Sequence, residues 1–156
     1  MGVFTWKRFW ILLGLLVVVA GGYFASMMLP GGALAGKATD VPADWTDVEV
    51  PDIVQFETNP ADPYSVNIWA VPLGPYIYIH RGDSRSRWVE HIEADPSVRL
   101  LVSDRLYEMT ALRVTDSAEF ADFSAAYETR YGRRPGNENV AEVYVFRLAA
   151  RQAHED

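Results

Sequence analysis

The chain has 156 residues, of which 49% are hydrophobic and 22% are charged, a composition typical of a folded domain. Its 14 Lys and Arg against 21 Asp and Glu give a net charge of −7, which argues against nucleic-acid binding, because such binding needs a surplus of cations facing phosphate. The sequence has no cysteine, and this excludes disulfides, thiolate metal sites, iron–sulfur clusters and thiol nucleophiles.

Residues 9–29 form an apolar run without a charged residue. As a helix this run would be roughly 31 Å long, enough to cross the hydrocarbon core of a membrane. Lys7 and Arg8 precede the run, so the positive-inside rule predicts a cytoplasmic N-terminus. We therefore expect a single-pass protein of the cytoplasmic membrane, with residues 1–35 as the anchor and the rest of the chain outside, on the periplasmic side.

A cleaved signal peptide is the alternative interpretation of the same segment. Pro30 follows the apolar run, and the small residues Ala33 and Ala35 make a pattern that signal peptidases recognise. Cleavage near Ala35 would give a secreted domain. The apolar run is longer than the usual signal core of about 7 to 15 residues, which favours the uncleaved anchor.

Composition and periodicity divide the remaining chain into a linker, a domain and a tail. Residues 36–47 mix Gly, Pro, Asp and Thr without periodicity and predict a linker, followed by a domain at 48–150 and a tail at 151–156. Within the domain, β-rich runs predict six strands and helical spacing predicts two helices. The predicted strands are 48–58, 65–73, 76–80, 98–103, 106–115 and 140–150, and the predicted helices are 87–95 and 117–131.

The second of these helices carries the clearest local pattern. Asp116 and Glu119 resemble a capping box, and Gly132 is expected to end the helix. Aromatic residues spaced three and four apart predict one buried face; they are Phe120, Phe123, Tyr127 and Tyr131.

The strand at 106–115 changes its apolar face midway, as a strand does when it bends round a barrel corner. Six strands and only two helices favour a mainly β fold, a small antiparallel barrel, over a doubly wound sheet.

Several stretches together resemble a known superfamily. They are "PYSVNIWAVPLGPYIYIH", "RSRWVEHIEADPSVRLLV", "YEMTALRVTD" and "AAYETRYG", within residues 48–148. In element order, and in the succession of basic residue, short helix, Asp-Pro and strand at 87–102, they resemble the flavin-binding split-barrel superfamily. That superfamily includes pyridoxamine-phosphate-oxidase-like and deazaflavin-dependent nitroreductase-like proteins.

The resemblance implies a six-stranded split barrel that forms a homodimer and binds FMN or a related flavin or deazaflavin at the subunit interface. It also implies that the cofactor phosphate is held where the third strand leads into the first helix, at Arg81, Ser84, Arg85, Ser86 and Arg87. The chemistry of these residues agrees, because guanidinium groups bind phosphate in pairs of hydrogen bonds, hydroxyls add neutral donors and a helix N-terminus adds free N–H groups.

Three further residues are candidates for the same site. Trp69 and Trp88 are candidates to flank a flat ring, although large aromatic residues more often fill a core. His80 is a candidate haem ligand, since some split barrels bind haem, although a lone histidine at a strand end is more often structural.

Two functions remain open at this level. The first is a membrane-anchored, exported split barrel that binds FMN or a related redox cofactor and acts as an oxidoreductase. The second is a split barrel without a cofactor, which serves as a binding or assembly module or as an accessory subunit of a membrane complex.

Overall fold

The computed structural model describes residues 31–82 and 86–151. The predicted membrane anchor at 9–29 lies outside these residues. Within the two described ranges, neither helix combines the length and the hydropathy that a membrane crossing requires.

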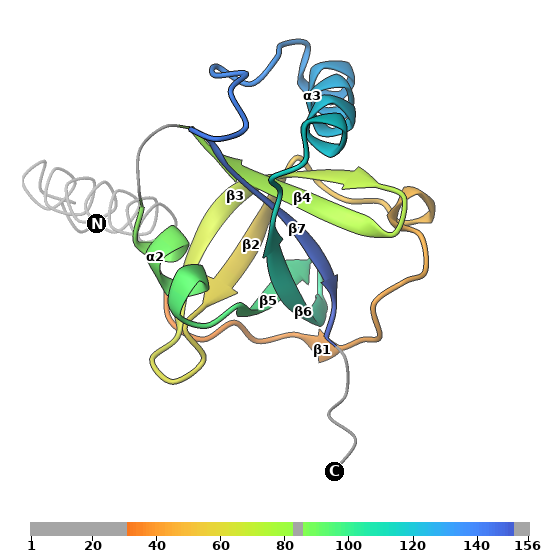
Figure 1. Ribbon diagram of the computed structural model, residues 1–156. Helices are drawn as coiled ribbons and strands as arrows, with labels where there is room; N and C mark the ends of the chain where they lie inside the picture. The colour runs from red at the N-terminus through yellow and green to blue at the C-terminus, as the bar shows by residue number, and fades with distance from the viewer. Residues whose placement is uncertain (1–30, 83–85, 152–156) are drawn as a thin grey trace, which may run out of the picture. The chain divides into compact units, whose positions relative to one another are not determined.

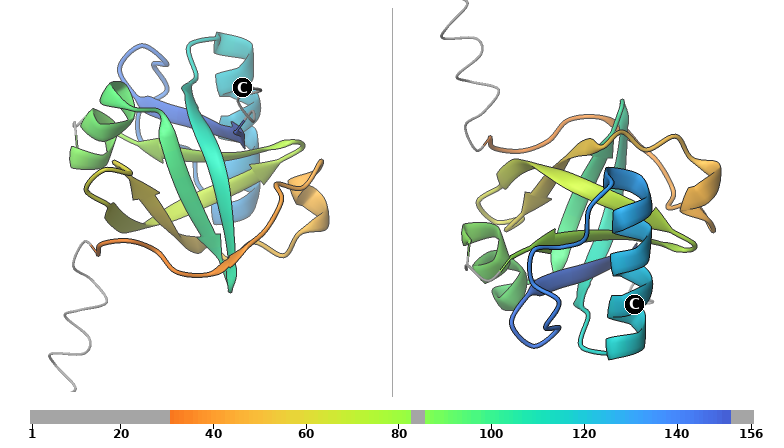
Figure 2. Two further views of the ribbon diagram at one scale, coloured as in Figure 1. Left: turned by 90° about the horizontal axis from the view of Figure 1, so that it is seen from below. Right: turned by 90° about the horizontal axis from the view of Figure 1, so that it is seen from above.

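Six strands form a closed antiparallel barrel. They are β2 (Ile53–Thr58), β3 (Tyr64–Leu73), β4 (Tyr76–Arg81), β5 (Ser97–Val102), β6 (Arg105–Arg113) and β7 (Tyr144–Ala150). Around the barrel their order is β2, β3, β4, β7, β6, β5 and back to β2. Figure 2 shows the β5–β6 pair crossing β3 and β4, as strands on opposite walls of a barrel do. The predicted mainly β fold is thus confirmed.

In the described part of the chain, two α-helices accompany the barrel, α2 (Arg87–Ala94) and α3 (Ser117–Tyr131), and each contributes to a different apolar core. Helix α2 directs Trp88, Val89 and Ile92 into the core inside the barrel. Helix α3 covers the outer face of β3 and β4 (Figure 1), where Phe123 and Tyr127 pack on Val71. Beneath α3, the barrel wall therefore has apolar side chains on both its inner and its outer face. Elsewhere the apolar side chains lie mainly on the inner face.

The ends of α3 are those that the sequence predicts. Asp116 Oδ1 accepts hydrogen bonds from the backbone N–H groups of Ala118 (3.0 Å) and Glu119 (2.9 Å). Gly132 ends the helix with φ 71°, a left-handed conformation that glycine adopts without steric cost. The Glu119 side chain does not complete the capping box, because its carboxylate instead binds Arg147 and Tyr78.

Strand β6 changes partners along its length, which explains its change of apolar face. Its first part pairs with β5, and from Met109 onward it also pairs with β7. Tyr107 and Met109 lie in the barrel core, whereas Val114, just past the strand, belongs to the cluster beneath α3. Leu112, which shares the outer phase, is 39% exposed.

Two predicted strands are shorter than expected. The strand predicted at 48–58 begins only at Ile53, because Pro51 lacks the N–H that a ladder needs. The strand predicted at 140–150 begins at Tyr144, because Asn139 closes a turn by accepting hydrogen bonds from the backbone N–H groups of Ala141 and Glu142.

Residues 36–47, for which the composition predicts a linker, pack against the barrel. They contain the short strand β1 (Lys37–Ala38), which runs parallel to β6, and the 3-10 helix η1 (Trp45–Asp47). Trp45 is fully buried against Tyr107, with their ring centroids 4.9 Å apart. These are contacts between segments distant in sequence, so local composition did not reveal them.

We call residues 31–39 the N-terminal strap, because hydrogen bonds join them to the barrel at intervals from Gly31 to Thr39. Gly31 exchanges two backbone hydrogen bonds with Ser65 of β3, at 2.8 and 2.9 Å. The Leu34 N–H donates to the carboxylate of Glu57 at 2.5 Å, and the Thr39 N–H donates to the Leu106 carbonyl at 3.0 Å. The strap thus crosses from β3 over β2 and β5 to β6.

Candidate functional site

Strands β3 and β4 part halfway along their length. They pair from Leu73 and Tyr76 as far as Ala70 and Ile79, and no further. Beyond that point, β3 continues to pair with β2, and β4 continues to pair with β7 as far as Arg81. We call the opening between the two strands the fork.

A pocket of about 270 Å³ lies at the fork. Its lining residues are Tyr64, Val66, Asn67, Ile68, His80, Arg81, Ser86 and Trp88. Val66 and Ile68 pack on the barrel core yet remain half-buried, because β4 has turned away from this part of β3. With Trp88 they give the pocket an apolar wall suited to a flat ring.

The start of α2 forms the polar end of this pocket. Ser86 is the N-cap residue of α2, but its side chain makes no capping hydrogen bond. Its Oγ atom is shielded from solvent, and no described group is hydrogen-bonded to it. A buried hydroxyl without a partner is costly, so the Oγ of Ser86 keeps an unused capacity for hydrogen bonding next to the pocket.

Arg87, the first residue of α2, lies beside the pocket. Its guanidinium group is 5.4 Å from the ring centroid of Tyr64, a pocket residue, and its side chain is exposed. The first turn of a helix has N–H groups without intrahelical acceptors, and the helix dipole adds positive potential there. Serine hydroxyl, guanidinium and helix terminus together form a set of donors suited to a phosphate group.

His80 is a lining residue of the pocket, and its imidazole extends towards α3. Its ring packs edge-on against Tyr127 of α3, with centroids 4.8 Å apart. Burial, and then the positive charges of Arg133 and Arg81, lower the pKa of His80 to about 4. At neutral pH the imidazole is therefore uncharged, with one N–H donor and one acceptor nitrogen.

The structure thus brings together four residues that the sequence singled out, His80, Arg81, Ser86 and Trp88. Ser84 and Arg85 lie outside the described residues.

Trp69 is not part of this pocket. Neighbouring strand residues point to opposite faces, so that Ile68 lines the pocket while Trp69 lies on the α3 side. There the Trp69 ring stacks on Tyr131 at 4.8 Å and is covered by the guanidinium of Arg133, also at 4.8 Å.

Sequence reasoning missed Tyr64, Val66 and Ile68 as lining residues of the pocket. Their apolar character was visible in the sequence, but the parting of β3 from β4 was not.

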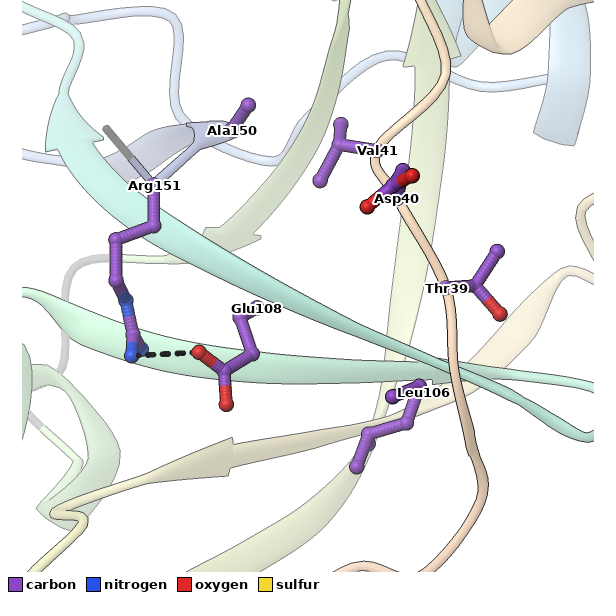
Figure 3. A pocket seen from close by; sticks show the side chains of 8 residues that line it. Thr39, Asp40, Val41, Leu106, Glu108, Ala150 and Arg151 are labelled. Atoms are coloured by element: carbon purple, nitrogen blue, oxygen red, sulfur yellow. Dashed lines mark hydrogen bonds and ion pairs between the residues drawn. The ribbon is translucent and has the colours of Figure 1, made fainter. Parts of the chain in front are cut away.

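A larger cleft of about 580 Å³ lies between the strap and the ends of β6 and β7. Figure 3 shows Glu108 and Arg151 facing each other across part of it, and the residues from Thr39 to Val41 on the opposite side. The Arg151 guanidinium and the Glu108 carboxylate are paired at 3.1 Å, so these charges are already satisfied. None of the site residues expected from the sequence lines this cleft.

A comparison with protein-family models gives no match, and a comparison with curated protein sequences gives none either. Solved structures, by contrast, share the fold. HutZ, the heme storage protein from Vibrio cholerae, is similar with a TM-score of 0.55 and 18% identity, over 65% of this chain and 83% of that chain. The chain has the split-barrel fold.

Two further solved structures agree. A protein from Listeria innocua, provisionally assigned as a pyridoxamine 5′-phosphate oxidase, has a TM-score of 0.52 and 13% identity, over 65% of this chain and 86% of that chain. General Stress Protein 26 from Bacillus anthracis has a TM-score of 0.50 and 17% identity, over 66% of this chain and 82% of that chain. The resemblance found in the sequence is therefore confirmed at the level of the fold.

Proposed function

We propose that this split barrel binds FMN or a related flavin or deazaflavin at the fork and acts as an oxidoreductase. The observation that carries the proposal is the buried, unpartnered Oγ of Ser86 at the polar end of an apolar pocket. Arg87 and Arg81 add cationic donors beside it.

The residues present fit such a cofactor. Ser86, Arg87 and the N–H groups that begin α2 would hold its phosphate, and Val66, Ile68 and Trp88 would contact its ring. A flavin supplies hydride or electron transfer when bound, whereas the protein supplies binding, orientation and exclusion of water. The neutral imidazole of His80 would offer a hydrogen bond without adding charge beside the ring.

The size of the pocket supports a homodimer. A complete small-molecule site usually encloses about 300 to 1,000 Å³, and the fork of one chain offers about 270 Å³. A second copy that covered the fork would enlarge and close the site.

Membrane attachment through residues 9–29 is part of the proposal, with the barrel on the periplasmic side. Release after cleavage near Ala35 is the alternative, which mass spectrometry of the mature N-terminus distinguishes. Cleavage would also remove Leu34, whose N–H is bonded to the buried carboxylate of Glu57. This bond favours the uncleaved chain.

Haem is the second candidate ligand. HutZ, which shares the fold, is described as a heme storage protein. A neutral imidazole is the form that binds a metal, and His80 is held neutral in the pocket wall. A Soret band that disappears in the variant His80→Ala would favour haem over a flavin.

Titration of the full-length protein in mild detergent with FMN, followed by flavin fluorescence, tests the leading proposal. We expect Ser86→Ala and Arg87→Ala each to weaken binding by roughly tenfold, because each removes a hydrogen bond to a charged group. Arg134→Ala is the matched control, since Arg134 is paired with Glu128 and Glu138 outside the pocket.

The proposal fails if FMN, a deazaflavin and haem all leave the protein spectrum unchanged, or if the control variant weakens binding as much as the fork variants. That result would favour the second function, a binding or assembly module or an accessory subunit of a membrane complex. Light scattering of the same samples tests the dimer.

A further inference from the structure

Tyr64, the first residue of β3, lies where the fork meets helix α2. It lines the pocket, and alternation along β3 puts its side chain on the same face as Val66 and Ile68. Figures 1 and 2 show α2 beside the turn that joins β2 to β3, where β3 begins. Tyr64 can therefore contact both the pocket and side chains of α2.

Two side chains of α2 contact the ring of Tyr64. Arg87, the first residue of the helix, places its guanidinium 5.4 Å from the ring centroid, which is within the range of a cation–π interaction. His91 packs its ring edge to face against the same tyrosine, with centroids 5.3 Å apart and planes at 87°. Residues four apart lie on one face of a helix, so a single face of α2 packs on this ring.

The Tyr64 ring is itself held in place from two sides. His91 Nδ1 is hydrogen-bonded to Thr58 Oγ1 at 2.9 Å, and Thr58, which is 1% exposed, pairs with Tyr64 in the β2–β3 ladder. The next residue, Ser65, exchanges two backbone hydrogen bonds with Gly31 of the strap. The ring is therefore fixed by contacts within the protein before any ligand binds.

The contact with Tyr64 orients Arg87 and leaves its charge available. A tyrosine ring is neutral, so it restrains the guanidinium without forming an ion pair with it. An arginine side chain has many rotamers, and ordering it on binding an anion costs free energy. A guanidinium already held beside the N-terminus of α2 avoids part of this cost.

We propose that Tyr64 is a positioning residue: its ring, held by His91, orients Arg87 towards the phosphate of the cofactor, so that the fork selects a phosphorylated flavin over an unphosphorylated one. The inference rests on the proposed function for the ligand, and it deepens that function by naming a residue that sets specificity. Because Tyr64 acts through Arg87, its contribution is confined to ligands that carry a phosphate. A cation–π contact at an exposed site corresponds to about a two- to fivefold change in affinity.

The test is a titration of the full-length protein in mild detergent with FMN and, in parallel, with riboflavin, which has the same ring system and no phosphate. The variants are Tyr64→Leu, which removes the aromatic ring, and Tyr64→Phe, which keeps it. The matched control is Tyr76→Leu, because Tyr76 also lies under an arginine, Arg147 at 5.5 Å, but does not line the pocket.

A second measurement does not depend on a flavin. The side-chain NMR signals of Arg87 are recorded without ligand and during titration with inorganic phosphate. In the wild type, the ring current of Tyr64 should shift these signals upfield, and phosphate should shift them further in a saturable way. Tyr64→Leu should abolish the ring-current shift and weaken phosphate binding, whereas Tyr64→Phe should retain both.

We expect Tyr64→Leu to weaken FMN binding by about two- to fivefold and to leave riboflavin binding unchanged. Tyr64→Phe and Tyr76→Leu should bind FMN as the wild type does. In the background of Arg87→Ala, the change Tyr64→Leu should have no further effect on FMN binding, because the ring acts through the guanidinium that is already absent.

Three results would overturn the inference: equal weakening of FMN and riboflavin binding by Tyr64→Leu, a further loss of FMN binding in the Arg87→Ala background, or Arg87 signals that Tyr64→Leu leaves in place. If FMN binds and any of these results is found, the proposed function stands and this inference fails. If neither flavin binds the wild type, the proposed function fails, and the phosphate titration alone decides whether Tyr64 positions Arg87 for an anion.

Discussion

Buried polar side chains on two sides of the barrel differ in whether they have hydrogen-bond partners. On the β2–β5 side, the carboxylate of Glu57 is 2% exposed and fully partnered, accepting hydrogen bonds from Arg99 Nε at 2.7 Å and from the Leu34 N–H at 2.5 Å. At the fork, the Oγ of Ser86 is equally shielded and has no described partner. The hydrogen bonds of Glu57 stabilise the fold, whereas the Ser86 hydroxyl retains a free capacity for hydrogen bonding.

The variant Glu57→Ala should give the largest effect, on the stable side. It leaves Arg99 and the Leu34 N–H without their acceptor, and loss of one partner of a buried ion pair costs on the order of 3 kcal/mol. Urea unfolding of the full-length protein measures this loss. Glu108→Ala is the control, because its pair with Arg151 is exposed and should contribute less than about 1 kcal/mol. Equal losses of unfolding free energy in the two variants would mean that the buried ion pair of Glu57 stabilises the fold no more than the exposed pair of Glu108.

The fork should respond to acid through His80. Its folded pKa of about 4 lies below the ordinary value of 6.5, so between these values the unfolded chain binds a proton that the folded chain does not. Stability therefore falls as the pH falls through this window, by about 2 kcal/mol between pH 7 and pH 5. The variant His80→Gln should lose less stability over the same range. If the unfolding free energies of wild type and variant changed equally with pH, the pKa of His80 would not be lowered in the folded protein.

The two helix N-termini provide a finer comparison. Asp116→Ala should cost about 1 kcal/mol, because the side chain accepts from two backbone N–H groups of α3. Ser86→Ala should leave the free energy of unfolding nearly unchanged, because its hydroxyl has no described partner to lose. A cost for Ser86→Ala as large as that for Asp116→Ala would mean that the hydroxyl is bonded in solution and that α2 is closed to ligands.

The sequence predicted the elements well wherever a signal is local. The spacing of Phe120 and Phe123 and the caps at Asp116 and Gly132 predicted α3 to the residue, since caps and periodicity depend only on neighbours. The strap was missed for the opposite reason: Lys37 pairs with Arg105, and Gly31 with Ser65, through backbone groups that every residue possesses.

Four of the residues that the sequence proposed for the site line one pocket, and whether they bind a cofactor stays a prediction. The resemblance singled out Arg81 and Ser86, at the end of a strand and the start of a helix, and with His80 and Trp88 they line one pocket. Alternation along β3 cannot tell which face is the pocket, so Trp69 was expected on the side that Ile68 occupies.

The strap also has a mechanical consequence. Gly31 joins β3 at Ser65, between the pocket residues Tyr64 and Val66. A pull or twist applied to the chain ahead of Gly31 would pass into β3 through two backbone hydrogen bonds, without the slack of a linker. The wall of the pocket and the point where the strap joins β3 belong to one strand, so a displacement of the strap at Gly31 acts on residues that line the fork.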